Sequence, residues 1–369
     1  MMPDDSIDNS PPRTWAEIDL QALSHNLKIA RKSSDQAIMA VLKAGAYGHD
    51  IKHIARFLEG ENLAFFGVAS VIEARRISST GCKTKLYLLG PTLTDECAEI
   101  VHNRWVPSIS SLKDAQYFNE LNATTSNPPL PIHITVDTGM GRGGFLPGQL
   151  ETQFSEILKL EHIIVEGIGS HLPSADEDKE FTLKQFQNFE AIVKQCDYHF
   201  KYIHLANSAG ILDYKSSLCN LCRPGLMIYG ISPIESYQRQ LKPVMTLKSK
   251  ITLIRELPAG HGVSYGRSIL LDKPTRIATI GAGYGDGYPR SLSGKNPTVI
   301  IRGVHCPVIG RVTMDQIMVD VSELPDATTG DEVELFGKHI SVAEIAAKAD
   351  TIPWEILTRI TPRVTRIYR

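Results

Sequence analysis

Lys43 stands where a buried strand is expected to end. Residues 37–42 form an uninterrupted apolar run, and Lys43 follows at once. A run without polar residues predicts a strand buried on both faces, as in the interior of a parallel sheet. Partial desolvation at such a strand end lowers the pKa of a lysine amine and lets it form a Schiff base. The same pattern also fits a lysine whose amine simply reaches solvent.

Further polar clusters follow other expected strands. In chain order they are Tyr47, Asp137 to Arg142, His171, His204 to Ser208, and Arg223 to Leu226. Each fragment alone fits a turn, a helix cap or a core histidine. Their recurrence at successive strand ends instead indicates a binding site, because the carboxyl ends of barrel strands lie at one face.

The chemistry of these clusters suits a phosphorylated, planar cofactor. Backbone amides at Ser208 and at Gly225 and Leu226 can hold an anion, and the Tyr47 hydroxyl can add a donor. His171 can lie flat against an aromatic ring, Arg223 can donate to a ring nitrogen, and Lys43 can hold an aldehyde. This set of groups predicts pyridoxal 5'-phosphate.

Strand and helix patterns alternate through the first two thirds of the chain. The predicted strands are 37–42, 64–69, 85–90, 104–109, 131–137, 163–169, 201–206 and 222–230. Helical stripes lie between most of them, as in 51–58 and 177–195. This count favours an α/β fold with a (β/α)8 TIM barrel. A doubly wound open sheet is the competitor, but no G-x-G-x-x-G follows the first strand.

From about residue 243 the pattern changes to short β-rich runs divided by Gly and Pro. The predicted strands there are 250–254, 276–280, 298–302, 316–321 and 332–336, with a helix over 342–348. We therefore predict two domains, a barrel over 14–243 and a mostly β domain over 244–369.

Composition excludes several classes of protein. The 369 residues have a formal net charge of -2 and no long basic run, which argues against nucleic acid as a partner. No apolar run approaches a membrane span, and the leader 1–12 lacks the features of a signal peptide. Six scattered cysteines suit a reducing compartment, so we expect a cytoplasmic protein. Cys219 and Cys222 form a lone C-x-x-C, which we interpret as buried thiols rather than a metal site.

Residues 40–49, Ala-Val-Leu-Lys-Ala-Gly-Ala-Tyr-Gly-His, closely resemble the cofactor-lysine signature of the alanine racemases. Further motifs in the same order are Asp137 to Arg142, His204 to Ser208, Arg223 to Gly225, Val263 to Gly266, Gly283 to Arg290, Gly310 to Asp315 and Arg359 to Val364. They span nearly the whole chain, so the resemblance is specific.

The resemblance implies a pyridoxal-phosphate barrel followed by a β domain, a homodimer, and interconversion of L-alanine and D-alanine for peptidoglycan synthesis. It implies two bases, Lys43 and Tyr265 of the partner subunit, with the strand at 14–20 packing in the β domain. It also assigns supporting residues: Asn207 and Trp354 near the cofactor, Arg142 and Met314 as substrate contacts, and His204 and Asp315 behind them.

Three departures from the family pattern bear on specificity. Thr135 occupies the position of a lysine that the family commonly carbamylates, so Arg142 should be held by an anion such as chloride or by a neighbouring side chain. Trp354 replaces a usual tyrosine, and Gly45 and residues 171–174 also differ. The alternatives are a same-fold racemase preferring serine or another amino acid, and a non-catalytic pyridoxal-phosphate barrel protein.

Overall fold

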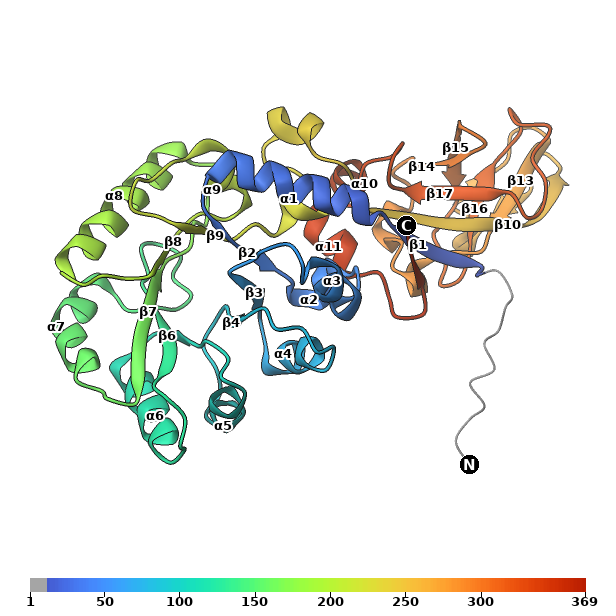
Figure 1. Cartoon of the computed structure of the whole chain (residues 1–369). Coiled ribbons are helices and arrows are strands. Elements are labelled where there is room, and N and C mark those ends of the chain that lie inside the picture. Colours follow the sequence, from blue (N-terminus) through green and yellow to red (C-terminus); the bar gives the residue numbers. More distant parts are fainter. Residues whose placement is uncertain (1–11) are drawn as a thin grey trace, which may run out of the picture. The chain divides into compact units, whose positions relative to one another are not determined.

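Two units make up the chain in its computed structural model, which describes residues 12–369 (Figure 1). One comprises Gln21–Lys242, and the other comprises Pro243–Arg369 together with residues 12–20. Residues 1–11, which hold most of the leader expected to lack a secretion signal, lie outside the described residues. No helix in the described part is long and apolar enough to cross a membrane.

The barrel unit contains eight strands in one sheet, in the order β4-β3-β2-β9-β8-β7-β6-β5. Their bounds are β2 Ala37–Val41, β3 Phe65–Val68, β4 Leu86–Leu88, β5 Ser108–Ile109, β6 Leu130–Thr135, β7 Ile163–Gly169, β8 Tyr202–His204 and β9 Leu221–Cys222. The paired strands run parallel, and an isolated parallel bridge between Tyr87 and Val106 joins the two ends of the sheet. The predicted (β/α)8 barrel is confirmed.

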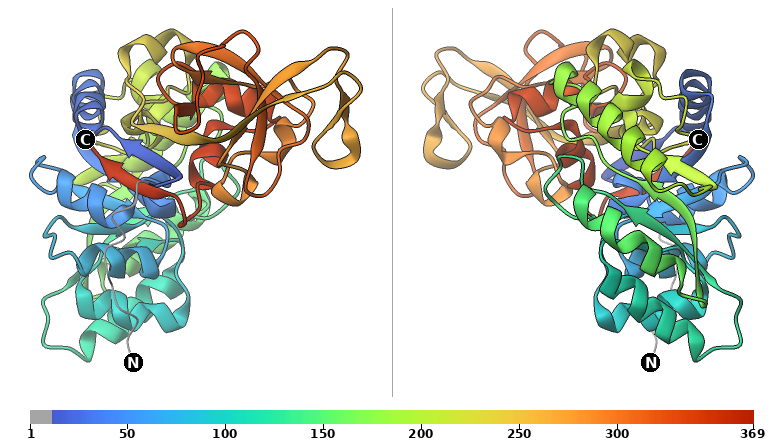
Figure 2. Two further views of the ribbon diagram at one scale, coloured as in Figure 1. Left: turned by 90° about the vertical axis from the view of Figure 1, so that its right-hand side faces the viewer. Right: turned by 90° about the vertical axis from the view of Figure 1, so that its left-hand side faces the viewer.

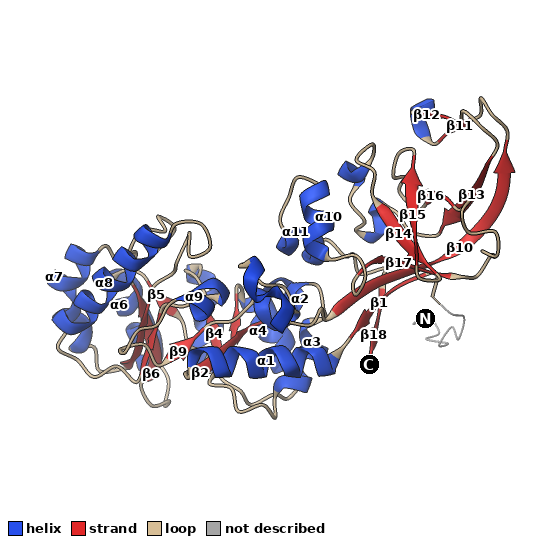
Figure 3. Cartoon of the chain, turned by 90° about the horizontal axis from the view of Figure 1, so that it is seen from above, coloured by secondary structure: helices blue, strands red, loops and turns tan. Residues whose placement is uncertain are grey.

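Helices connect the barrel strands and lie outside them (Figure 3). They are α1 Leu20–Ser34, α2 Lys43–Tyr47, α3 Ile51–Leu58, α4 Val71–Ser78, α5 Thr94–Asn103, α6 Leu112–Ala123, α7 Pro147–Leu158, α8 Lys179–Gln195 and α9 Ser208–Asp213. Short polar residues begin several of them: the side chains of Asp50, Ser70 and Asp178 accept from backbone amides of α3, α4 and α8. Each cap satisfies a donor that the first helical turn leaves unpaired.

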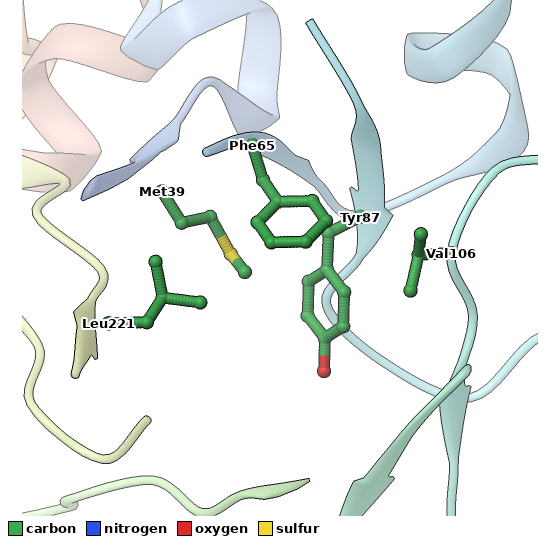
Figure 4. Packing of buried hydrophobic residues seen from close by; sticks show 5 residues of the cluster. All are labelled: Met39, Phe65, Tyr87, Val106 and Leu221. Carbon is green, nitrogen blue, oxygen red and sulfur yellow. The ribbon is translucent and has the colours of Figure 1, made fainter. Parts of the chain in front are cut away.

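Apolar side chains from neighbouring strands fill the barrel interior. Met39, Phe65, Tyr87, Val106 and Leu221 form one buried cluster, and Figure 4 shows the Met39, Phe65 and Tyr87 side chains directed into a shared space. Inward side chains of parallel barrel strands pack against each other in this way. The apolar run that precedes Lys43 is therefore a core strand.

The other unit is built mainly of β-strands, most of which are gold, orange or red in Figure 2, while β1 is blue. They are β1 Thr14–Ile18, β10 Met245–Leu257, β11 Gly262–Val263, β12 Ile269–Leu270, β13 Thr275–Ile280, β14 Thr298–Ile301, β15 Val304–Ile309, β16 Ile317–Asp320, β17 Glu332–Phe336 and β18 Thr365–Tyr368. Two helices accompany them, α10 Val342–Lys348 and α11 Pro353–Thr358. Strand β1 pairs antiparallel with β10 and parallel with β18. The mostly β second unit is confirmed.

Two predicted strands are much shorter than expected. The strand predicted over 222–230 ends at Cys222, and a 3-10 helix over Leu226–Tyr229 follows. Pro224 explains this, because its ring removes an amide donor that a ladder would need. The strand predicted over 104–109 is limited to Ser108–Ile109, because Arg104 closes α5 in a left-handed conformation.

Candidate active site

Lys43 begins a left-handed turn at the carboxyl end of β2. The φ/ψ angles are 53/47 at Ala44, 66/36 at Gly45 and 55/51 at Ala46, and φ is 53 at Tyr47. This conformation returns the chain sharply, so that the half-buried Lys43 and the buried Tyr47 both belong to the strand-end face of the barrel. Only glycine adopts it without steric cost, so the surrounding contacts must hold the other residues there.

The Lys43 amine lies in a predominantly cationic environment. Burial lowers its pKa, the Arg142 and Arg223 guanidinium groups lower the pKa further, and the Glu73 carboxylate opposes them. An amine that loses its proton more easily is a better nucleophile and base. The sequence-based expectation for this lysine concerned burial alone, and the structure adds the two guanidinium groups.

Arg223 is buried, and acceptors hold both of its terminal nitrogens. Its Nη1 donates to His204 Nδ1 and to the His204 carbonyl at 3.1 Å. Its Nη2 donates to the Ser170 carbonyl, to the Leu205 carbonyl at 3.2 Å and to His171 Nδ1 at 3.4 Å. A guanidinium held by acceptors at the carboxyl ends of β7 and β8 presents a fixed array of N–H groups and keeps its charge.

A histidine that the sequence analysis did not select continues this network. His133 Nδ1 lies 2.9 Å from His204 Nε2. Because Arg223 can only donate to His204 Nδ1, the His204 proton sits on Nε2 and is donated to His133 Nδ1. Burial lowers the pKa of His133 to about 3 and that of His204 well below its ordinary value, so both rings are neutral at physiological pH. His133 lies within β6 and not at its end, and its neighbours Ile132 and Ile134 are also buried, so neither strand-end position nor alternation selected it.

Acidification from pH 7 to pH 5 should destabilise the protein. Folded His133, with its pKa near 3, binds no proton in this window, whereas the unfolded side chain titrates near 6.5. The unfolded state therefore binds more protons, and the free energy of unfolding should fall as the pH falls, by about 2 kcal/mol for His133 alone. Urea unfolding at the two pH values measures this, in a window that lies above the range of most carboxylates. Equal free energies of unfolding would contradict the burial of a neutral imidazole.

Several backbone amides lie beyond β8 and β9, and most of them are paired within the chain. Asn207 caps α9 by accepting from the Gly210 amide at 3.0 Å, and Ser208 Oγ accepts from the amides of Gly225 and Met227 at 3.1 and 3.3 Å. Within the described chain, no acceptor contacts the buried Leu226 amide. A buried amide without an acceptor costs free energy unless a ligand pairs with it.

The Tyr47 hydroxyl lies beside the same backbone segment, at Gly225. A Cβ at Gly225 would lie only 2.5 Å from Tyr47 Oη, so the hydroxyl packs directly on the Gly225 backbone. It has no hydrogen-bond partner among residues 12–369. The Tyr47 ring stacks on Tyr229 at 4.7 Å between centroids, and the Tyr229 hydroxyl donates to the Val41 carbonyl at 3.0 Å. Burial raises the pKa of Tyr47, so its hydroxyl remains a donor.

Arg142 extends from the loop that follows β6. Asp137 Oδ1 shapes this loop by accepting from the amides of Gly139, Met140 and Gly141 at 2.8, 2.8 and 3.1 Å. Arg142 is exposed and forms no ion pair or hydrogen bond with another described residue.

Thr135 does not support this arginine, since its hydroxyl pairs with Ser108 Oγ. Of the two expected supports for Arg142, a neighbouring side chain is not found among residues 12–369, and a bound anion stays a prediction. Among residues 12–369, no carboxylate forms an ion pair with Arg142 in place of the carbamate.

The remaining predicted site residues belong to the β unit. Tyr265 lies between β11 and β12 and is 71% exposed. The Ser264 hydroxyl donates to the Arg311 carbonyl at 2.7 Å, which ties this hairpin to the segment before Met314. Met314 is 52% exposed. Two large apolar or aromatic side chains are thus held outward on joined loops.

Ion pairs of Arg363 hold the chain segment that contains Met314. Arg363 pairs with Asp286 at 2.8 Å and with Asp315 at 2.9 Å, and the Gly285 amide donates to the Met314 carbonyl at 2.8 Å. Trp354 is half-buried in the first turn of α11.

A parallel barrel that gathers an activated amine, a fixed guanidinium and unpaired donors at its strand ends is the architecture of an enzyme. Comparison with known proteins identifies which enzyme family this is. Residues 18–233 match the family described as "Alanine racemase, N-terminal domain", and residues 244–368 match "Alanine racemase, C-terminal domain".

Relatives and solved structures agree with these matches. The chain is 39% identical over 366 residues to alanine racemase of Methylacidiphilum infernorum (isolate V4), covering 97% of this chain and 93% of that protein. It is similar to the structure of alanine racemase from Clostridium difficile 630, with a TM-score of 0.92, 35% identity and coverage of 98% and 96%. For alanine racemase from Bartonella henselae with covalently bound pyridoxal phosphate, the TM-score is 0.87, with 30% identity and coverage of 97% and 100%. The chain belongs to the alanine racemase family and is an amino-acid racemase, an isomerase.

Proposed function

We propose that the protein interconverts L-alanine and D-alanine with pyridoxal 5'-phosphate, using Lys43 and Tyr265 of the partner subunit as its two bases. The observation that carries this proposal is the shared strand-end site of Lys43, His171 and Arg223, with unpaired donors at Tyr47 and Leu226. The relatives bear the same activity in their names, and one related structure contains the cofactor.

The residues present fit this cofactor. A phosphate would satisfy the Leu226 amide and the Tyr47 hydroxyl, which lie against the Gly225 backbone beside Ser208. His171 and Arg223, joined at 3.4 Å, offer a ring face and a donor to the pyridine nitrogen. Lys43 would hold the aldehyde carbon. When bound, the cofactor supplies a conjugated electron sink for the Cα carbanion of the substrate.

Proton transfer needs one group on each face of the substrate. Lys43 Nζ, whose pKa is lowered by burial and by two guanidinium groups, can take a Cα proton or return it on one face. The Tyr265 hydroxyl of the partner subunit would do the same on the other face. A base on one face and an acid on the other account for inversion in both directions.

Arg223 would limit the chemistry to racemisation. A guanidinium does not give up its proton, so Arg223 would donate to the ring nitrogen of the cofactor without protonating it. The weaker electron sink that results disfavours side reactions such as transamination. The neutral chain of His204 and His133 fixes the arginine without supplying an extra proton.

A homodimer would complete the site. Tyr265, Leu270 and Met314 are large side chains left 52–71% exposed in a single chain, an arrangement that suits contact with a second copy. For Arg142 we propose that a bound anion such as chloride takes the place of the family's carbamate. We further propose a cytoplasmic role in supplying D-alanine for peptidoglycan.

Purified protein supplied with pyridoxal phosphate tests the function. We expect a visible absorbance band that borohydride abolishes, and formation of D-alanine from L-alanine faster than conversion of serine or larger amino acids. A higher rate with L-serine would instead support the serine-preferring alternative. Trp354 and Thr135, which depart from the family pattern, are the residues that suggested this alternative. Cofactor binding with no racemisation of any amino acid would favour the non-catalytic alternative.

Gly225→Ala should weaken cofactor binding at least about tenfold and destabilise the fold by about 1–3 kcal/mol. The new methyl group would lie 2.5 Å from Tyr47 Oη and displace that ring from the anion site. Titration with pyridoxal phosphate and urea unfolding measure the two effects.

Two variants separate packing from binding. Gly60→Ala is the matched control, because a Cβ at Gly60 meets nothing within 4 Å. Adding Tyr47→Phe to Gly225→Ala should recover most of the stability and little of the affinity, since the hydroxyl that clashes is also a proposed ligand. Unchanged affinity in Gly225→Ala would contradict the proposed phosphate position.

A further inference from the structure

The turn that carries Lys43 is conformationally costly. Residues Ala44 to Tyr47 all have positive φ, and three of the four are not glycine. Each L-residue in this conformation costs roughly 1–2 kcal/mol relative to the right-handed form. Such a segment persists only where neighbouring groups over-determine it, which is typical of functional sites.

Hydrogen bonds within the turn stabilise its left-handed conformation in part. The Ala46 amide donates to the Leu42 carbonyl at 2.7 Å, and the Gly48 amide donates to the Ala44 carbonyl at 3.0 Å. His49 Nδ1 lies 2.9 Å from the carbonyls of Ala46 and Tyr47. The Leu42 amide donates to the Gly67 carbonyl of β3 at 2.8 Å, but none of these contacts ties Ala44, the residue after Lys43, to another element of the barrel.

A carboxylate from α4 makes that connection. Glu73 Oε1 accepts from the Ala44 amide at 2.5 Å, and Glu73 Oε2 accepts from the Ala69 amide at 2.8 Å. The Glu73 amide donates to Ser70 Oγ at 3.3 Å, so the helix cap fixes the residue that makes the clamp. Both oxygens of one ionised side chain therefore bridge the residue after Lys43 to the start of α4, in charge-assisted bonds.

The Glu73 carboxylate also acts on the Lys43 amine through its charge. Three cationic or ring groups face Lys43, namely Arg142, Arg223 and His171, while Glu73 is the acidic group that acts on its amine. Burial and the guanidinium groups lower the pKa of Lys43, and Glu73 partly restores it. Without this carboxylate the amine would lose its proton still more easily.

We propose that Glu73 is a positioning residue for Lys43: its carboxylate anchors the left-handed turn to α4 and holds the amine in place beside two guanidinium groups. The inference rests on the proposed function only in taking Lys43 as the residue that reacts. Glu73 touches neither substrate nor cofactor in this assignment, and it acts through the Ala44 backbone and through its charge.

Two substitutions separate anchoring from charge. Glu73→Gln keeps a carbonyl oxygen for the Ala44 amide but removes the charge, whereas Glu73→Ala removes both. Glu99→Gln is the control, since the Glu99 carboxylate also faces α4, through Arg75 at 2.6 Å, but contacts nothing in the turn. Cofactor-free protein is used first, so that the readouts do not depend on catalysis.

Competitive acetylation of the Lys43 amine across a pH series, followed by mass spectrometry, reports its pKa. We expect Glu73→Gln and Glu73→Ala to lower that pKa by about 0.5–1 unit, and Glu99→Gln to leave it unchanged. Hydrogen exchange of the peptide spanning 42–49 reports the turn. We expect about tenfold faster exchange in Glu73→Ala, a smaller change in Glu73→Gln, and no change in a β7 peptide spanning 163–169.

In the loaded enzyme, Glu73→Ala should lower kcat about 10–100-fold with little change in KM, because substrate contacts remain. The proposal would be overturned if Glu73→Ala showed the wild-type rate of hydrogen exchange over 42–49 and also the wild-type pKa of Lys43. A wild-type protein that binds no pyridoxal phosphate and racemises nothing would refute the proposed function, while the cofactor-free measurements would still decide the role of Glu73.

Discussion

Tyr265→Phe is expected to lower the racemisation rate at least about 10³-fold, with the cofactor still bound. The change removes one hydroxyl from a side chain that is 71% exposed in a single chain, so stability should be unaffected. Loss of the proton carrier on one substrate face stops inversion in both directions. Rates from L-alanine and from D-alanine, with absorbance of the bound cofactor, provide the measurement.

Tyr237→Phe is the matched control for this variant. Tyr237 lies in a 3-10 helix of the barrel unit, Glu235–Gln240, and is not one of the proposed site residues. Its substitution should leave both rates unchanged. If Tyr265→Phe retained full activity in both directions, Tyr265 would have no role in proton transfer and the two-base proposal would fail.

Lys43→Ala should abolish racemisation, again by at least about 10³-fold, and should eliminate the borohydride-sensitive absorbance band. The amine is both the proposed covalent anchor and the base on one face, and residues 44–51 contain no other lysine. The substitution replaces the lysine side chain with a smaller one that causes no clash, so the barrel should still fold. Absorbance spectra and racemisation assays on the same sample test both expectations.

Mixing the two inactive variants tests the shared site. If Tyr265 acts in the neighbouring subunit, a dimer of one Lys43→Ala chain and one Tyr265→Phe chain contains one site with both native groups and one site with neither. Random exchange of subunits should then restore about a quarter of the wild-type activity. If Tyr265 acted within its own chain, every site would lack one base, and mixing would restore nothing.

Local sequence patterns predicted much of the architecture. The apolar run 37–42 corresponds to β2 and its buried residues, the stripe 51–58 to α3, and 342–348 to α10, because side-chain periodicity reports which face of an element is buried. The barrel followed from repeating strand and helix patterns, since a parallel sheet needs a crossover after each strand. Strand ends near Pro224 and Arg104 were misplaced, because backbone conformation there depends on single residues.

The candidate site was only partly predictable. Strand-end position selected Lys43, His171, Arg223 and Ser208, which the structure gathers within one unit. It could not select His133, whose role depends on a contact with His204 across 71 positions of the chain. It also could not select Glu73, which is one more polar residue in the first turn of an amphipathic helix until its carboxylate is seen on the Ala44 amide.

By itself the sequence determined the barrel, the β unit, the family motifs and the residue types available for chemistry, because these depend on local burial patterns and on residue identity. Only the tertiary structure decided the left-handed turn at Lys43, the neutral His133–His204 pair behind Arg223, and the unpaired donors at Tyr47 and Leu226. Backbone strain, tautomers and desolvation arise from contacts between segments distant in the chain, and such contacts exist only once the strands have closed into a barrel.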